Sequence, residues 1–336
     1  MRLFMGSTAA LSFAALISVV YNSVALGAND EVAVKPSLKA GKIVKMPGGA
    51  GKFDWMMVDA RRDCLLAGHK GSGTLEVLNL KTDKLKASLK VGECQGVAAS
   101  NKYYFAGDAE EQKVVFIDAV SLKTVAEVKV PGEIDAMAYD PKNDKLYADH
   151  DDGKDVWVID VASRKIVKTI DIGGVPEYVE VDSSGQRVFQ NNKTANTVVV
   201  IDAKDQKVEA DWSTLPAEKP HGLALDEKQN RLYTAGGNGF LVAIDLKTGK
   251  SVSSVAIPPG VDQIALDAEL NRIYCACRQK EVISVVDCSG PTLRVLQNLP
   301  VAAGAHTLTV DPQRHSVWFS YADNTGSFLQ RCDRIN

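Results

Sequence analysis

The sequence has no long hydrophobic run and little net charge, and each absence excludes a class of protein. The apolar run from Leu11 to Val20 is shorter than the roughly 20 residues that a membrane-spanning helix needs, so we expect no membrane span. Lys and Arg number 39 against 42 Asp and Glu, for a formal charge of −3. Because no basic excess is available to neutralise phosphates, nucleic acid is a poor candidate partner.

Recognisable catalytic motifs are also missing. The sequence contains no Ser-centred nucleophile elbow, no HExxH and no CxxCH, which excludes the easily recognised hydrolases and a covalently bound c-type haem. Its six cysteines are irregularly spaced, unlike a dense disulfide framework. They are therefore interpreted as buried thiols, or as forming one or two disulfides.

The N-terminus has the three parts of a secretory signal. Arg2 is basic, the apolar run follows, and small residues at Ser23-Val24-Ala25 or Leu26-Gly27-Ala28 offer a cleavage site. Residues 1–28 are thus predicted to be a signal peptide and residues 29–336 a single domain. We expect the mature protein to be periplasmic or extracellular. The first cysteine is Cys64, too far along the chain for a lipid anchor next to the signal.

Internal repetition is the strongest feature of the remaining sequence. VWVIDVASRKIVKTIDIGG (156–174) resembles VVFIDAVSLKTVAEVKVPG (114–132) and LVAIDLKTGKSVSSVAIPPG (241–260). Each segment reads as an apolar strand ending in Asp, a polar turn and a second alternating strand. An Asp side chain can bond its own downstream backbone and so set a tight turn, which makes the repeated acid structural. The acids of this series are Asp118, Asp160, Asp202, Asp245 and Asp287, with Asn79 before them and Asp333 after.

A second pair of strands precedes each of these segments, as in IDAMAYDPKNDKLYADH (134–150) and HGLALDEKQNRLYTAGG (221–237). Four short strands in a period of about 42 residues are the signature of a propeller blade. The fold is therefore predicted to be an all-β, seven-bladed β-propeller of four-stranded blades. The last blade lacks an outer strand, which the N-terminal segment 38–48 is expected to supply, closing the ring. The predicted blade starts are Phe53, Cys94, Ile134, Pro176, Pro220, Val261 and Ala305.

The segment from Asp155 to Asn192 resembles the YVTN-type β-propeller repeat family. The repeat of that family has, in this order along the chain, the residues VID, T, I, GG, P, V, D, G and N. This resemblance extends over essentially the whole mature chain. It implies an exported propeller, and for function it implies little, because propellers of this kind include ligand-binding modules and parts of oxidoreductases. The signature Asn is kept only at Asn192.

Two sets of residues are predicted to line one mouth of the central channel, because a first strand starts where the second strand of its hairpin ends. Every member of the first set is polar: Asp54, Gln95, Asp135, Glu177, His221, Asp262 and His306. The second set, at the ends of the second strands, is His69, Gly107, His150, Asn192, Gly236, Cys277 and Tyr321. Trp55 and Tyr178 follow first-set residues and could stack on a ligand, although packing between blades also explains them.

The polar mouth has two interpretations. A water-filled channel tolerates polar groups, so repetition alone accounts for them. Four histidines with neighbouring carboxylates instead indicate a divalent transition metal. Under that hypothesis the ligands are His69, His150, His221 and His306.

These observations favour a non-catalytic binding or scaffold protein that engages a small ligand or a protein partner at the His/Asp-rich mouth. One alternative is a metal-dependent hydrolase or lactonase-like enzyme, in which a mouth ion activates water. Another is a haem- or quinone-associated accessory subunit of a periplasmic oxidoreductase.

Overall fold

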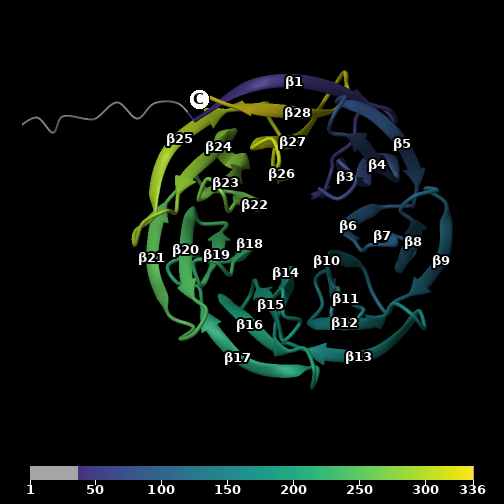
Figure 1. The fold of residues 1–336 in the computed structure, drawn as a ribbon, viewed down its shortest axis with the longest axis horizontal. Coiled ribbons are helices and arrows are strands. Elements are labelled where there is room, and N and C mark those ends of the chain that lie inside the picture. The colour runs from purple at the N-terminus through teal and green to yellow at the C-terminus, as the bar shows by residue number, and fades with distance from the viewer. Residues whose placement is uncertain (1–36, 336) are drawn as a thin grey trace, which may run out of the picture. The chain divides into compact units, whose positions relative to one another are not determined.

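The computed structural model describes residues 37–335, and within them the chain forms seven four-stranded antiparallel sheets arranged in a ring (Figure 1). The predicted seven-bladed β-propeller is confirmed. The predicted signal peptide, residues 1–28, lies outside the described residues. Across the range 37–335, no helix is long and apolar enough to cross a bilayer.

Each blade contributes one strand to each of four concentric rings. The first strands, nearest the channel, are β2 (Trp55–Asp59), β6 (Cys94–Ala99), β10 (Ile134–Asp140), β14 (Pro176–Val181), β18 (Pro220–Asp226), β22 (Val261–Asp267) and β26 (Leu308–Asp311). The second strands are β3 (Cys64–His69), β7 (Tyr103–Asp108), β11 (Lys145–His150), β15 (Arg187–Asn192), β19 (Arg231–Gly236), β23 (Arg272–Cys277) and β27 (Ser316–Asp323).

The two remaining rings complete the blades. The third strands are β4 (Thr74–Asn79), β8 (Lys113–Asp118), β12 (Asp155–Asp160), β16 (Thr197–Asp202), β20 (Phe240–Asp245), β24 (Val282–Asp287) and β28 (Gly326–Arg334). The outer strands are β5 (Lys84–Lys90), β9 (Thr124–Lys129), β13 (Lys165–Asp171), β17 (Lys207–Ser213), β21 (Ser251–Ala256), β25 (Arg294–Pro300) and β1 (Leu38–Met46). Short 3₁₀ turns, η1 (Lys70–Ser72) and η2 (Arg278–Lys280), follow β3 and β23.

The N-terminal strand closes the ring as predicted. Strand β1 pairs antiparallel with β28, from Leu38 opposite Arg334 to Met46 opposite Ser327. The Gln297 side chain of β25 accepts hydrogen bonds from the backbone N–H of Ser37 and Leu38 at 2.7 and 2.9 Å. The start of the described chain is therefore tied both to the last blade and to the blade before it.

The repeated acids have the structural role that the sequence indicates. Asp118, Asp160 and Asp202 each accept a hydrogen bond from the backbone N–H three residues later, at 2.7 Å. Asn79 makes the equivalent contact with Thr82 at 3.0 Å. Asp333 instead lies within β28, where no outer strand follows. The turns between the third and outer strands thus carry their own local hydrogen bonds.

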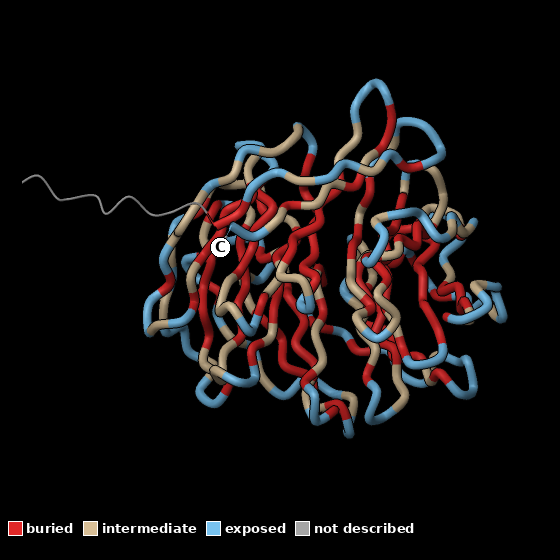
Figure 2. Tube along the Cα trace, turned by 45° about the horizontal axis from the view of Figure 1, so that its top comes forward, coloured by how far each residue is buried: buried red, intermediate tan, exposed pale blue. Residues whose placement is uncertain are grey.

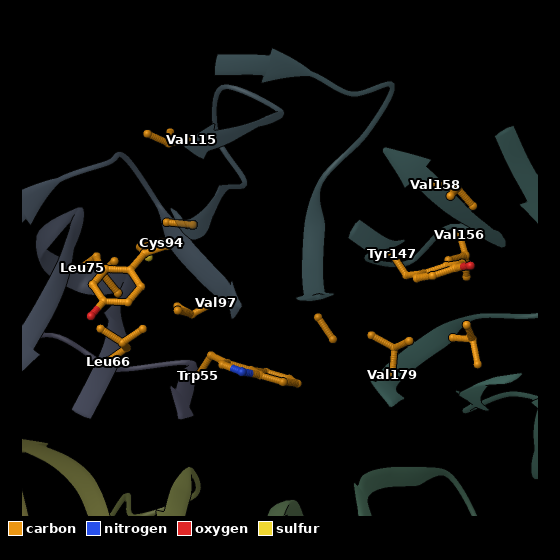
Figure 3. Close-up of a cluster of buried hydrophobic side chains, with 14 of the residues drawn as sticks. Trp55, Leu66, Leu75, Cys94, Val97, Val115, Tyr147, Val156, Val158 and Val179 are labelled. Atoms are coloured by element: carbon orange, nitrogen blue, oxygen red, sulfur yellow. The ribbon is translucent and has the colours of Figure 1, made fainter. Parts of the chain in front are cut away.

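Apolar side chains fill the spaces between blades, where Figure 2 shows the chain buried. One such cluster joins the first four blades and contains Trp55, Cys94, Tyr147 and Val179 (Figure 3). All six cysteines are buried free thiols, so the structure favours that interpretation over disulfides. Burial raises the pKa of each thiol, which keeps the cysteines protonated and unreactive.

Candidate functional site

The nine side chains predicted at the mouth line one cavity of about 240 Å³ at the end of the channel. They come from all seven blades, and they are Asp54, Trp55, Gln95, Asp135, Glu177, Tyr178, His221, Asp262 and His306. The structure therefore brings the complete set together, although the nine are scattered over more than 250 residues of sequence.

A β-bulge at the start of the first strand orients the side chains of most of these residues. In β10, Ile134 pairs with His150 and the next paired residue is Met137, so Asp135 falls inside the bulge. Register shifts at the corresponding point enclose Gln95, Glu177, His221 and Asp262 in their blades. Because a bulge rotates the local backbone, it turns a side chain away from the sheet. Here it directs five polar groups into the channel mouth.

Six further lining residues were not identified from the sequence. Lys70, Asp151, Lys193 and Arg278 each follow directly after a second strand, one position beyond the predicted second set. The other two, Lys52 and Gln263, flank first-set positions. The sequence did offer a signal for the first four residues, because the position directly after the second strand is charged in each of these blades. The six residues give the cavity four cationic side chains beside its carboxylates.

The second set of residues is placed differently. His69 is fully buried, stacks on Phe53 at 4.1 Å, and points its Nε2 at the Ser327 hydroxyl, 3.0 Å away. His150 packs on Trp157 with ring centroids 4.9 Å apart. Neither histidine lines the cavity, so the four histidines do not converge. The second strands lie one strand farther from the channel, and alternate side chains there point between blades.

The strand register also moves one member of that set. Cys94 pairs with Asp108, as Ile134 pairs with His150, so the equivalent of His150 in this blade is Asp108 and not Gly107. Asp108 is buried and accepts hydrogen bonds from the backbone N–H of Glu93 and Glu111. It therefore holds a loop in place and does not face the mouth.

One side of the cavity gathers Glu177, His221 and Asp262 from three successive blades. One ligand atom from each lies within 4.8 Å of the others. Glu177 Oε1 is 3.4 Å from His221 Nε2, and Glu177 Oε2 is 2.5 Å from Lys193 Nζ. Burial raises the pKa of Glu177, while His221 and Lys193 act in the opposite direction.

The adjacent side is organised around His306. Its Nε2 lies 3.8 Å from both Asp54 Oδ1 and Asp262 Oδ2, and its Nδ1 is 2.8 Å from the Gly304 carbonyl. Burial lowers the pKa of this imidazole, but Asp54 and Asp262 outweigh burial and raise the pKa overall. Burial likewise raises the pKa of Asp54, and His306 together with nearby lysines reverses that effect.

Asp135 stands out among the carboxyl groups of the mouth. Burial and the neighbouring carboxylates of Glu177 and Asp149 raise its pKa well above the ordinary range. Asp149 lies beneath it, fully buried, and accepts hydrogen bonds from Ala136 N–H and the Gln190 amide. Two closely spaced acids in one buried region favour retention of a proton.

Trp55 and Tyr178 form the floor of the cavity. Their rings come from β2 in the first blade and β14 in the fourth, and pack with centroids 4.5 Å apart. Beyond them the first strands line two less polar cavities of about 220 and 310 Å³, and Glu180 borders both. The aromatic pair thus separates a charged mouth from the remainder of the channel.

Gln263 connects three blades beside this floor. Its amide donates to the Met56 carbonyl at 2.9 Å, and its carbonyl oxygen accepts from Leu308 N–H at 3.2 Å. Gln263 belongs to β22, Met56 to β2 and Leu308 to β26. The side chain therefore ties the first strands of the last two blades to that of the first blade.

Fold and site together define a β-propeller with a charged cavity at its channel mouth, bounded on one side by a packed aromatic pair. The chain belongs to the family described as "Domain of unknown function (DUF5074)", whose model matches residues 71–297. The YVTN-type resemblance of the Asp155 to Asn192 segment stays a prediction. A comparison with curated protein sequences found no match.

Solved structures of other propellers are similar to this chain. The RRP9 WD40 repeats superpose with a TM-score of 0.76 at 12% identity, covering 89% of this chain and 100% of that one. A chain of the mitotic checkpoint complex gives 0.77 at 14% identity, covering 95% and 99%. Hydrazine synthase from Kuenenia stuttgartiensis gives 0.72 at 13% identity, covering 86% and 97%. At these identities the similarity concerns the fold alone.

Proposed function

We propose that this protein is an exported binding or scaffold protein that engages a small polar ligand, or a polar segment of a protein partner, at the channel mouth. The observation that carries the proposal is the convergence of polar side chains from every blade on one cavity of about 240 Å³. Ligand sites are typically concave and hold a few convergent polar groups.

The charges of the mouth suit a ligand that itself carries both signs. Carboxylates of Asp54, Glu177 and Asp262 face a positively charged group, and Lys70 and Arg278 face a negatively charged one. The Trp55 and Tyr178 rings below offer an apolar surface. Amino acids and short peptides have this combination of groups and fit a cavity of this size.

The scaffold part of the proposal is supported by the fold. One structurally similar chain comes from the mitotic checkpoint complex, a multiprotein assembly. The exported location rests on the predicted signal peptide, residues 1–28. Secretion should therefore yield a protein that begins after Ala25 or Ala28, and an uncleaved N-terminus by mass spectrometry would count against export.

A calorimetric and thermal-shift screen tests the mouth as the binding site. The probes are amino acids, dipeptides, dicarboxylates and diamines, and we expect a zwitterionic probe to bind best. Gln95→Leu and Asp135→Leu should weaken that binding by about tenfold or more, since each removes a polar group of the lining. Asp205→Asn, on an exposed turn at the opposite end of its blade, is the matched control. Equal binding by all three variants would move the site elsewhere.

A further inference from the structure

We propose that the mouth holds a divalent transition metal ion, liganded by Glu177, His221 and Asp262. This deepens the proposed function, because the ion would form one wall of the same cavity. The ligand set differs from the one predicted from the sequence, since His69 and His150 lie outside the cavity and two carboxylates take their place.

The spacing of the three groups is close to that of a bound ion. Ligand atoms about 2.1 Å from a tetrahedral zinc ion lie roughly 3.4 Å from one another. Glu177 Oε1 and His221 Nε2 are already 3.4 Å apart, and all three ligand atoms lie within 4.8 Å. The ligand atoms therefore already lie close to the separation that a common ion would impose.

Contacts behind the ligands hold them in the required orientation. His221 Nδ1 lies 2.7 Å from the Lys219 carbonyl, so this nitrogen carries the proton and Nε2 presents its lone pair to the carboxylates. Metal-binding histidines usually donate their second N–H in this way. On the other ligand, Lys193 contacts Oε2 of Glu177 and leaves Oε1 facing the histidine.

A second histidine independently points to a bound ligand. His306 is only 7% exposed, and its Nδ1 is likewise occupied by a backbone carbonyl, that of Gly304. Its Nε2 faces the cavity and has no hydrogen-bond partner within the described chain; the carboxylates of Asp54 and Asp262 are 3.8 Å away. This nitrogen is placed to serve as a fourth ligand, or to bond a water held by the ion.

The chemistry of the donors selects the class of ion. Imidazole with carboxylates suits zinc and its neighbours in the first transition row, whereas magnesium and calcium prefer oxygen donors alone. An organic ammonium group could also donate to these carboxylates and imidazoles, but acceptors about 2.8 Å from its nitrogen would lie roughly 4.6 Å from one another. The 3.4 Å between Glu177 Oε1 and His221 Nε2 therefore favours a metal ion over an amine.

Titration of the chelator-treated protein with Zn²⁺ tests the site, with Co²⁺ as a probe whose visible absorption reports nitrogen and oxygen ligands. We expect one equivalent to bind. His221→Gln should lower the affinity about a hundredfold and Asp262→Asn at least tenfold, since each removes a direct ligand. His150→Gln is the matched control, because it changes a histidine that also lies beside a carboxylate, Asp155, at 3.8 Å. Its affinity should equal that of the unaltered protein.

Absence of stoichiometric Zn²⁺ and Co²⁺ binding would overturn the proposal, as would unchanged affinity in His221→Gln or an equal loss in His150→Gln. Melting temperatures of the variants show that they are folded, and His221 is partly exposed, so its replacement leaves the core intact. Probe binding that depends on Gln95 and Asp135 in the metal-free protein would preserve the mouth as a binding site even if no ion binds. The two proposals thus fail separately.

Discussion

At the scale of single residues, carboxyl groups in this protein differ according to what surrounds them. Asp160 lies in an exposed turn, where hydrogen bonds from Lys145 and Ser163 lower its pKa. Asp54 is buried, yet His306 and two lysines keep its pKa low. Glu180 borders the less polar part of the channel, where burial raises its pKa to about 8. The pKa of the same functional group is therefore lowered in the turn and at Asp54 but raised at Glu180.

Glu180 should make folding stability depend on pH. Its folded-state pKa of about 8 exceeds the ordinary 4.5, so the folded protein holds a proton that the unfolded chain releases. Stability is therefore greatest below pH 4.5 with respect to this group, falls as the pH rises towards 8, and then levels off. Urea unfolding at pH 5 and pH 8.5 measures how much the free energy of unfolding falls over that interval. We expect the fall to be roughly 1–3 kcal/mol smaller for Glu180→Gln than for the unaltered protein. Identical losses would mean that Glu180 is ionised throughout.

At the scale of elements, β1 shows how one strand can combine a structural face with an exposed one. Leu38 and Met46, at its two ends, are each 2% exposed, whereas Ile43 in the middle is 51% exposed. Leu38 contacts the core between the last two blades, which also contains Phe319 and Cys332. Pairing with β28 covers the edge that the last blade would otherwise present to solvent.

Closure of the ring should therefore depend on the buried residues of β1. Leu38→Ala removes a side chain from a filled core, and we expect a loss of about 2–4 kcal/mol in the free energy of unfolding. The matched change Ile43→Ala, in the same strand, should cost less than about 1 kcal/mol because this side chain already faces water. Chemical denaturation of both variants makes the comparison. Similar losses for the two would indicate that β1 contributes through its backbone pairing alone.

At the scale of the whole molecule, the ring places residues that are distant in sequence on opposite walls of one channel. Trp55 and Tyr178 meet in this way, although more than 120 residues separate them. The contact divides the channel into the charged mouth, with its 15 lining residues, and the less polar cavities that Glu180 borders. The aromatic pair therefore lies at the boundary between the charged cavity and the less polar ones.

Removal of Tyr178 should open that floor. In Tyr178→Ala we expect the fluorescence of Trp55 to shift to the red and to be quenched more strongly by acrylamide, because water reaches the indole from both sides. The other three tryptophans also emit, so the control is Trp55→Phe alone against Trp55→Phe with Tyr178→Ala. The second substitution should change the spectrum only when Trp55 is present. An equal change in both backgrounds would place the effect elsewhere.

Most of the architecture could be predicted from the sequence, because the fold repeats one short pattern. The turn acids, such as Asp160, and the alternation of the strands recur at nearly constant spacing, so blade number and ring closure followed from the spacing itself. The first set of mouth residues was predicted for the same reason. Each member occupies one repeat position, and a register shift encloses that position in blades two to six.

The ends of the second strands could not be predicted equally well. A one-residue change at the end of a strand turns a side chain to the opposite side, so His69 and His150 point between blades whereas the adjacent Lys70 and Asp151 reach the mouth. Repeat spacing gives the order of residues around the ring but not the direction of each side chain.

By itself, the sequence determined that seven blades form and which strand positions surround the channel, since both depend on local patterns repeated along the chain. Only the tertiary structure decided that Glu177, His221 and Asp262 come within 4.8 Å of one another and that Trp55 meets Tyr178. Those contacts join different blades, and their distances depend on how the blades pack around a common axis. No local pattern carries that information, because it arises only when the ring closes.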